Sequence, residues 1–396
     1  MSSVIADPPT SDIDLFSDAI LADPYEAYRE LREMGPVVYL ERQSVWAVPR
    51  FAGVTEVLRD WEGFTSSEGV ALSDFGNARK GEIMVATDPP VHDRLRRVLS
   101  DRLSTGAVRG LAALVGSQAD DLVGELAERG EFDAVEDLAA IFPITVVADL
   151  IGLPAEGREN LIDWGSAVFD TFGPENERTA SAIPLAKKLA GYLEEVATRE
   201  RLTPGSMGMS VYEAADRGEI DAQSCIPLMS AYVVAGMDTT VNAIGSAILH
   251  LGEHPDQWQE LRDDPGLVRS AGNEILRFDS PVQAFARVTT AEQEVEGFSI
   301  PAGERVVPIF GSANRDERKW EDADSFRVKR NPIGHLAFGF GIHRCAGAGL
   351  ARLEIEAVLA AFTRSVKEIE IVGEPVRLLN NTTRGLRSLP ISVVPK

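Results

Sequence analysis

The ten residues FGFGIHRCAG, Phe338 to Gly347, place a cysteine in a glycine-rich loop directly before an apolar helix. Gly339 and Gly341 let the loop backbone approach a neighbouring group more closely than other residues would allow. The start of a helix offers unpaired N–H groups and positive potential, and both stabilise a thiolate. Cys345 is therefore well placed as an anionic sulfur ligand, although a buried structural cysteine is the commoner role of a free Cys.

Cysteine and histidine usage narrows the chemistry of this loop. The chain has 2 cysteines, Cys225 and Cys345, in segments of different character, so a disulfide framework is excluded. A tetrahedral zinc site needs about four ligands. His343 is the one histidine close to Cys345 and no second cysteine lies nearby, so zinc is disfavoured.

The composition is that of an acidic globular protein. The chain has 39 basic and 62 acidic residues, which gives a formal net charge of −23 and a pI near 4.7. This charge argues against a nucleic-acid-binding surface. Hydrophobic residues make up 44% of the chain and charged residues 26%, which suits a large packed core and argues against wholesale disorder.

The sequence indicates no membrane association. The first residues, MSSVIADPPTSDIDLFSD, contain neither a basic nor an apolar leader region, so we expect a cytoplasmic protein. The apolar stretch from Ile226 to Leu251 is long enough to span a bilayer, but Pro227, Asp238 and Asn242 interrupt it. We therefore expect a buried core helix there.

Hydrophobic periodicity predicts one predominantly helical domain over residues 1–396, with small β-sheets. Turn and strand signals place the sheets near both ends of the chain. In chain order we expect a flexible lead over residues 1–15, a hairpin of residues 37–40 and 45–48, a long loop over 61–90, helices nearly throughout 91–204, a long helix over 224–252, and β-rich segments after residue 285 and at the C-terminus.

The loop pattern Phe338-x-x-Gly341-x-x-x-Cys345-x-Gly347 resembles the haem-binding signature of the cytochrome P450 family. Further motifs resemble that family and occur in its order: DPPVHDRLRRVL at 88–99, AGMDTT at 235–240 and EILR at 274–277. Together they extend over almost the whole chain. The resemblance implies a P450 fold with a long central helix over haem b, in which Cys345 supplies the thiolate ligand of the iron.

The same resemblance assigns the contacts of the haem. Gly236 would leave room for oxygen beside a locally opened helix turn. Buried propionates need charged or hydrogen-bonding partners, whereas an ordinary surface charge is the alternative role for such side chains. The cofactor contacts implied are Phe338, Gly339, Ala235 and Gly236 around the ring, and His92, Arg96, Arg287 and His343 at the propionates.

Two polar groups are implied to support the chemistry. Asp238 and Thr239 would relay protons during oxygen activation, and structural bonding of Thr239 to its own helix is the alternative. Glu274 and Arg277 share a helix face and would join Arg330 in a buried structural network. The alternative for this second group is a solvent-exposed ion pair.

The segments expected near the haem suggest a flat aromatic substrate. Phe169 and Phe172 share one helix face just before a break, and Phe285 follows the EILR helix. Core packing is the alternative role for these rings. We also expect Val85, Val234 and Val282 at the substrate.

These segments resemble the bacterial P450 subfamily that oxidatively demethylates para-methoxybenzoates. That subfamily holds the substrate carboxylate with basic and hydroxyl side chains, and here only Arg79 and Ser230 are left for this task. A buried carboxylate without a strong partner is costly. We therefore expect a neutral para-substituted methoxyphenol or alkylphenol, such as an alkylguaiacol, rather than a benzoate.

The resemblance implies O2 as co-substrate and electrons from separate proteins, a [2Fe-2S] ferredoxin and its NAD(P)H-dependent reductase. A basic patch would steer the acidic ferredoxin, and scattered solvated arginines are the alternative. Other functions left open are hydroxylation of a terpenoid, steroid or polyketide, a haem-thiolate peroxygenase, and a non-catalytic haem sensor. The expected patch consists of Arg94, Arg96, Arg97, Arg102, Arg344 and Arg352.

Overall fold

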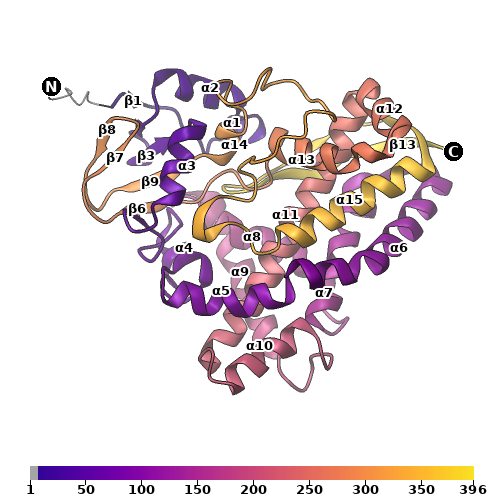
Figure 1. Cartoon of the computed structure of the whole chain (residues 1–396), viewed down its shortest axis with the longest axis horizontal. Helices are drawn as coiled ribbons and strands as arrows, with labels where there is room; N and C mark the ends of the chain where they lie inside the picture. The colour runs from indigo at the N-terminus through magenta and orange to yellow at the C-terminus, as the bar shows by residue number, and fades with distance from the viewer. Residues whose placement is uncertain (1–7) are drawn as a thin grey trace.

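The computed structural model describes residues 8–396 and shows the mainly helical fold with small sheets that the sequence predicts. Figure 1 shows the sheet-rich part on one side and the long helices crossing the rest of the molecule. The longer helices are α2 (Tyr25–Met34), α3 (Phe51–Arg59), α5 (Val91–Arg102), α6 (Thr105–Arg129), α7 (Ile141–Ile151), α8 (Leu161–Asp170), α9 (Glu177–Val196), α10 (Met207–Asp216), α11 (Cys225–Glu253), α12 (Pro255–Asp263), α13 (Val268–Phe278) and α15 (Ala348–Ser365).

The remaining elements are short. Helices of one turn are α1 (Asp18–Ala22), α4 (Asp74–Asn77) and α14 (Phe310–Ala313). The strands are β1 (Thr10–Ser11), β2 (Val38–Leu40), β3 (Val45–Val48), β4 (Phe64–Thr65), β5 (Glu131–Asp133), β6 (Arg287–Thr289), β7 (Gln293–Val295), β8 (Phe298–Ile300), β9 (Arg305–Pro308), β10 (Val366–Ile371), β11 (Val376–Leu379), β12 (Arg384–Ser388) and β13 (Pro390–Pro395).

Helix α11 runs through the centre of the helical part (Figure 1). Its side chains are apolar on nearly every face, so other helices cover it rather than water. It contacts α7, α8, α13 and α15 and the strand β12. Within residues 8–396, no helix combines the length and the apolar character that crossing a membrane would require.

A six-stranded sheet joins the N-terminal hairpin to the segment that follows α13. The strand order is β1-β2-β3-β9-β6-β4. The predicted hairpin forms as β2 and β3, and β3 pairs in parallel with β9, where Trp46 lies opposite Val306. Helix α3 contacts both β9 and the 3₁₀ turn Gly341–His343. This contact holds the sheet against the loop that carries Cys345.

The structure corrects three of the sequence expectations. The flexible lead expected over residues 1–15 is wrong for Thr10–Ser11, which pairs with β2, and for Leu15, which is buried. Residues 1–7 of that expectation lie outside the described residues. The expected loop over 61–90 contains β4, α4 and a 3₁₀ turn. The helical run of 91–204 is interrupted by β5, which pairs with β13, and by the π-helical turn Ala134–Ala139.

The structure brings Glu274, Arg277 and Arg330 together in one buried cluster. Glu274 and Arg277 are both fully buried, and the Arg277 Nε and Nη2 atoms donate to the two oxygens of Glu274 at 2.8 and 2.9 Å. Arg330 Nε donates to the same carboxylate at 3.0 Å. Arg277 Nη1 also donates to the carbonyl oxygens of Asn314 and Ala323, both at 2.8 Å. One guanidinium therefore ties α13 to the irregular segment that precedes the Cys345 loop.

We expect Glu274→Gln to destabilise the protein by about 3–5 kcal/mol, because it leaves the fully buried guanidinium of Arg277 and the partly buried one of Arg330 without their carboxylate. Denaturant unfolding of the purified protein measures this loss. Glu260→Gln is the matched control, since Glu260 pairs with Lys329 at the surface and its loss changes stability by about 0.5 kcal/mol or less. Equal losses in the two variants would contradict the structural role of the cluster.

Candidate active site

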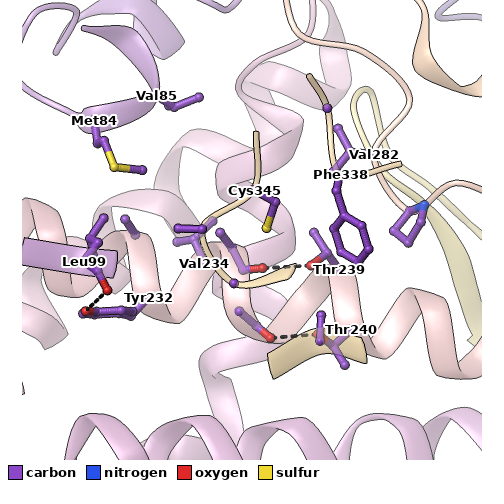
Figure 2. A pocket seen from close by; sticks show the side chains of 18 of the residues that line it. Met84, Val85, Leu99, Tyr232, Val234, Thr239, Thr240, Val282, Phe338 and Cys345 are labelled. Carbon is purple, nitrogen blue, oxygen red and sulfur yellow. Dashed lines mark hydrogen bonds between the residues drawn. The ribbon is translucent and has the colours of Figure 1, made fainter. Parts of the chain in front are cut away.

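A cavity of about 310 Å³ lies between α11 and the loop that carries Cys345. Figure 2 shows Cys345 facing the segment of α11 that carries Val234 and Thr239. Helices α5, α7 and α8 close other sides of the cavity, together with the segments 83–85 and 281–287. Segments far apart in the sequence thus meet around one space.

The backbone of the Cys345 loop is held in a specific shape. The Cys345 N–H donates to the Phe338 carbonyl oxygen at 2.8 Å. Gly339 and Gly341 have φ values of 65° and 69°, which other residues rarely adopt. At Gly341 a Cβ atom would also lie 2.1 Å from the carbonyl oxygen of Leu58 on α3. Only glycine fits at this close approach, which fixes the loop against α3.

Cys345 lies inside the protein but is exposed to the cavity that it lines. Burial raises the pKa of the Cys345 thiol, while the N–H of Gly347 and the charges of Arg96 and Arg352 act to lower it. A positive metal ion bound to the sulfur would favour the thiolate further. The site suits a metal-bound sulfur better than a free anion.

Buried basic side chains that are only partly hydrogen-bonded lie at another edge of the cavity. His92 Nε2 and His343 Nε2 are buried and have no hydrogen-bond partner in the described chain. The two imidazole rings are 4.6 Å apart. Burial lowers the pKa of His343 to about 4 and that of Arg287 to about 10. Arg287 Nη1 donates to a backbone carbonyl, and within residues 8–396 no carboxylate forms an ion pair with it.

These donors fit the anionic edge of a haem. His92 Nδ1 faces Asp93 at 3.0 Å, and His343 Nε2 lies 3.9 Å from Asp88. A buried polar atom left without a partner costs about 1–3 kcal/mol, so an anion at this edge would complete the cluster. Arg96, His343 and Arg287 line the same cavity as Cys345. A haem would be held here by Cys345 at its iron and by Arg96, His343 and Arg287 at its propionates, so the residues present fit a haem-thiolate protein.

On α11 the structure separates the two members of the predicted relay. Thr239 lines the cavity, and its hydroxyl donates to the Ala235 carbonyl oxygen at 2.8 Å (Figure 2). Thr240 bonds Gly236 in the same way at 3.1 Å. The helix is continuous through Gly236, so the locally opened turn expected there is not present in this part of the chain.

Asp238 lies behind the cavity wall rather than in it. Its side chain is 1% exposed and accepts a hydrogen bond from Asn242 Nδ2 at 3.0 Å. Burial raises the pKa of Asp238 to about 7, which the hydroxyls of Thr383 and Ser166 partly oppose and the nearby Asp170 reinforces. Below pH 7 this carboxyl group therefore carries a proton that it can donate.

Aromatic rings form another part of the cavity wall. The ring of Phe172 lies 6.2 Å from that of Phe169 and 5.8 Å from that of Phe285. Phe285 in turn lies 6.3 Å from Phe310. All four rings line the cavity in edge-to-face pairs, a stable arrangement for aromatic groups. Val85, Val234 and Val282 line it as well.

Arg79 does not take the position that the sequence suggested. Its side chain is 52% exposed, pairs with Glu82 at 3.1 Å, and does not line the cavity. Ser230 does line the cavity. A role for Arg79 as anchor of a buried carboxylate is therefore wrong in this structure.

Sequence reasoning missed several residues that line the cavity. Met84 and Leu99 are examples, as is Tyr232, whose hydroxyl donates to the Leu99 carbonyl oxygen at 3.1 Å (Figure 2). Phe310 completes the aromatic wall from the far side of the sheet. Met84 and Leu99 carried no signal, since both lie in ordinary apolar patterns, whereas Tyr232 interrupts an apolar helix and could have been noticed.

Comparison with known proteins identifies the family. The cytochrome P450 family model matches residues 209–370. The chain is 44% identical to cytochrome P450 CYP199A2 of Rhodopseudomonas palustris, with 98% of this chain and 95% of that protein covered. It is 33% identical to the beta-dihydromenaquinone-9 omega-hydroxylase of Mycobacterium tuberculosis, with 98% and 79% covered.

Solved structures show the same fold. Epothilone B-bound cytochrome P450epoK aligns with a TM-score of 0.86 at 28% identity, covering 97% of this chain and 100% of that one. The crystal structure of CalO2 aligns with a TM-score of 0.85 at 30% identity, covering 97% and 99%. The chain belongs to the cytochrome P450 family. Members are monooxygenases that carry haem with a cysteine thiolate ligand and take up O2 and electrons from redox partners.

We expect Arg287→Gln to weaken haem retention, because a neutral amide cannot replace the buried guanidinium at an anion. The loss is about 1.5–3 kcal/mol of haem binding, the value of a hydrogen bond to a charged group. Transfer of haem to an acceptor apoprotein measures it. Arg94→Gln, a change at an exposed arginine of α5, is the control. Equal rates of haem loss in wild type and Arg287→Gln would show that Arg287 does not bind the haem.

Proposed function

We propose that this P450 oxidises a small neutral aromatic compound and removes the methyl group of a para-substituted methoxyphenol as formaldehyde. The supporting observation is the charge of the cavity lining. Among the described residues that line the cavity, the cations are Arg96 and Arg287, and His343 is neutral. All three are expected at the haem propionates rather than at the substrate. A substrate carboxylate against the aromatic wall would lack a cationic partner, which is costly.

The reaction balances with O2, two electrons and two protons. Thiolate-ligated haem supplies the chemistry that inserts one oxygen atom into a C–H bond of the methoxy group while the other leaves as water. The hydroxylated methyl group is a hemiacetal, whose C–O bond breaks to give a phenol and formaldehyde. A methoxy carbon held near the thiolate axis is therefore the geometric requirement.

The side chains of this protein contribute position and protons. The rings of Phe172 and Phe285 can pack against the edge and face of an aromatic ring. The Thr239 hydroxyl faces the cavity and can donate a hydrogen bond there when it releases the Ala235 carbonyl. Asp238 holds a proton close behind it. Cys345 holds the haem, and His92, Arg96, Arg287 and His343 bind its propionates.

The electron donor is proposed to be an acidic ferredoxin. Arg96, Arg344 and Arg352 are close enough to act on the charge of Cys345, so they mark the sulfur side of the site. Electrostatic attraction of this kind raises association rates with an acidic partner. Arg94, Arg97 and Arg102 lie nearby on α5. Within residues 8–396, none of these six arginines forms an ion pair.

The choice of substrate is tested by the haem absorption shift that follows substrate binding. We expect a 4-alkylguaiacol to shift the spin state at lower concentration than 4-methoxybenzoate, because the acid must bury an unpaired carboxylate. The control is Ser230→Ala, which removes a hydroxyl of the cavity and leaves its charge unchanged. Tighter binding of the acid would contradict the neutral-substrate proposal. A response only to larger molecules would favour hydroxylation of a terpenoid, steroid or polyketide.

The relay is tested by Thr239→Ala. We expect NAD(P)H oxidation to continue while product per NAD(P)H falls roughly tenfold and peroxide rises, because a proton donor in the cavity is lost. The control is Thr145→Ala, since Thr145 is exposed and makes the same bond to its own helix on α7, to Ile141 at 2.9 Å. Unchanged coupling would count against the relay, and activity with peroxide alone would favour a peroxygenase.

A further inference from the structure

The end of α11 carries two histidines and a glutamate on one face. Glu253 and His254 follow His250 by three and four residues, a spacing that places side chains next to one another on a helix. One ligand atom from each of the three side chains lies within 4.8 Å of the other two. None of the three side chains lines the haem cavity. They therefore form a second polar centre, separate from the site around Cys345.

Hydrogen bonds determine which ring nitrogen of each histidine is free. His254 Nδ1 lies 2.9 Å from the carbonyl oxygen of His250. A carbonyl oxygen only accepts, so Nδ1 of His254 carries the proton and Nε2 keeps its lone pair. His250 Nε2 lies 3.4 Å from an oxygen of the Asp279 carboxylate. Each histidine thus directs one ring nitrogen at an oxygen and has the other left for a second partner.

The carboxylate of Asp279 is held in position for His250. It is 1% exposed and accepts from Arg384 Nε at 2.5 Å and from Ser246 Oγ at 2.9 Å. Arg377 Nη1 donates to it at 3.3 Å. A carboxylate paired with two guanidinium groups is an acceptor, so His250 donates its Nε2–H to it. Metal-binding histidines almost always donate their second N–H to a carboxylate or a carbonyl oxygen, and both arrangements occur at this centre.

The contact between His250 and Glu253 requires a positive ion. His250 Nδ1 lies 3.1 Å from Glu253 Oε2. With its proton on Nε2, a neutral imidazole would turn a lone pair toward the carboxylate oxygen, and the two atoms would repel each other. A second proton on the ring or a metal ion between the two atoms removes this repulsion. Two ligand atoms about 2.1 Å from a tetrahedral zinc ion lie about 3.4 Å apart, close to the observed contact.

We propose that His250 Nδ1, a carboxylate oxygen of Glu253 and His254 bind a zinc ion at the end of α11, with water as the fourth ligand. Two imidazoles and one carboxylate are a ligand set that zinc takes in proteins together with an open position. A proton needs only His250 and Glu253, whereas a third imidazole or carboxylate donor adds affinity for a metal. Glu253 is exposed and His254 is partly exposed, which gives zinc access from solvent.

Zinc at this position would join the end of the central helix to the segment that follows α13. Asp279 comes directly after α13, the helix that carries Glu274 and Arg277, and it accepts from the hydroxyl of Tyr25 on α2 at 2.6 Å. A ligand that binds only the folded chain stabilises it as the ligand concentration rises. The proposed ion is therefore a structural clamp and takes no part in the oxidation.

Equilibrium dialysis of the haem-loaded protein against zinc chloride measures the binding. The haem iron occupies the thiolate of Cys345, so that sulfur cannot take the zinc. We expect one zinc ion per chain, with an affinity at least about tenfold lower in His254→Gln and in Glu253→Gln, because even an outer partner of a zinc ligand is worth about 10–100-fold. Both altered side chains reach the surface, so both variants should fold. The control is Glu260→Gln, which alters a surface carboxylate paired with Lys329 and should bind zinc like the wild type.

X-ray absorption at the zinc edge identifies the ligands independently. We expect nitrogen and oxygen neighbours at about 2.0–2.2 Å, with imidazole scattering that weakens in His254→Gln. Sulfur at about 2.3 Å would place the ion at a cysteine and overturn the proposal. Equal zinc affinity in the wild type and both variants would overturn it as well, since carboxylates elsewhere would then hold the ion. If the wild type takes up no zinc, a proton alone joins His250 to Glu253 and the proposal fails.

Discussion

The buried guanidinium of Arg277 is the constraint on which the geometry of the site depends. Its N–H groups donate hydrogen bonds to the Glu274 carboxylate and to the carbonyl oxygens of Asn314, Ala323 and Ser325. The Asn314 side chain then accepts the N–H of Leu336 at 2.7 Å, shortly before the Cys345 loop begins. A buried ion pair adds little stability over apolar packing of the same volume, but it tolerates few alternative geometries. The sulfur is thus positioned by contacts made far from it.

Two sets of residues line the cavity, and they suit different kinds of bound group. On one side, His92 Nε2 and His343 Nε2 have no hydrogen-bond partner and Arg287 forms no ion pair within residues 8–396, so that side suits an anion. On the other side, the rings of Phe172 and Phe285 offer shape and dispersion contacts alone. A cofactor with an anionic edge satisfies the first side, which leaves the substrate side free to select by fit. The carboxyl group of Asp238 lies on the face of α11 that points away from the cavity and is buried there.

The parts of the site carried by short, contiguous motifs could be predicted from the sequence. Local residue spacing, which can be read directly from the sequence, predicts the Cys345 loop, the Glu274–Arg277 pair and the long central helix. Phe310 and Leu99 could not be predicted, because they reach the cavity from elements whose apolar patterns are common to any core. The π-helical turn Ala134–Ala139 likewise leaves no sequence signal, since it depends on the pairing of β5 with the distant β13.

Asp238 and Thr239 are adjacent in the sequence but point to different sides of α11. Adjacent residues on a helix point about 100° apart, so the motif that names Asp238 and Thr239 together places them on different sides of α11. The spacing alone predicts this separation. What faces Asp238 depends on the packing of α8 and on the turn after β11, where Asn380 bonds Ser166, and neither contact is local in sequence.

The arginines near Cys345 that lack ion pairs have a consequence beyond docking. The net charge is −23, but unpaired positive groups gather beside the sulfur, so the potential on that face is less negative than the overall charge suggests. A negatively charged protein approaching from elsewhere is repelled, and it experiences a torque that turns the arginine-bearing face toward it before the surfaces touch. If the electron donor is such a protein, dissolved salt, which shortens the reach of this field, sets the distance at which its alignment begins.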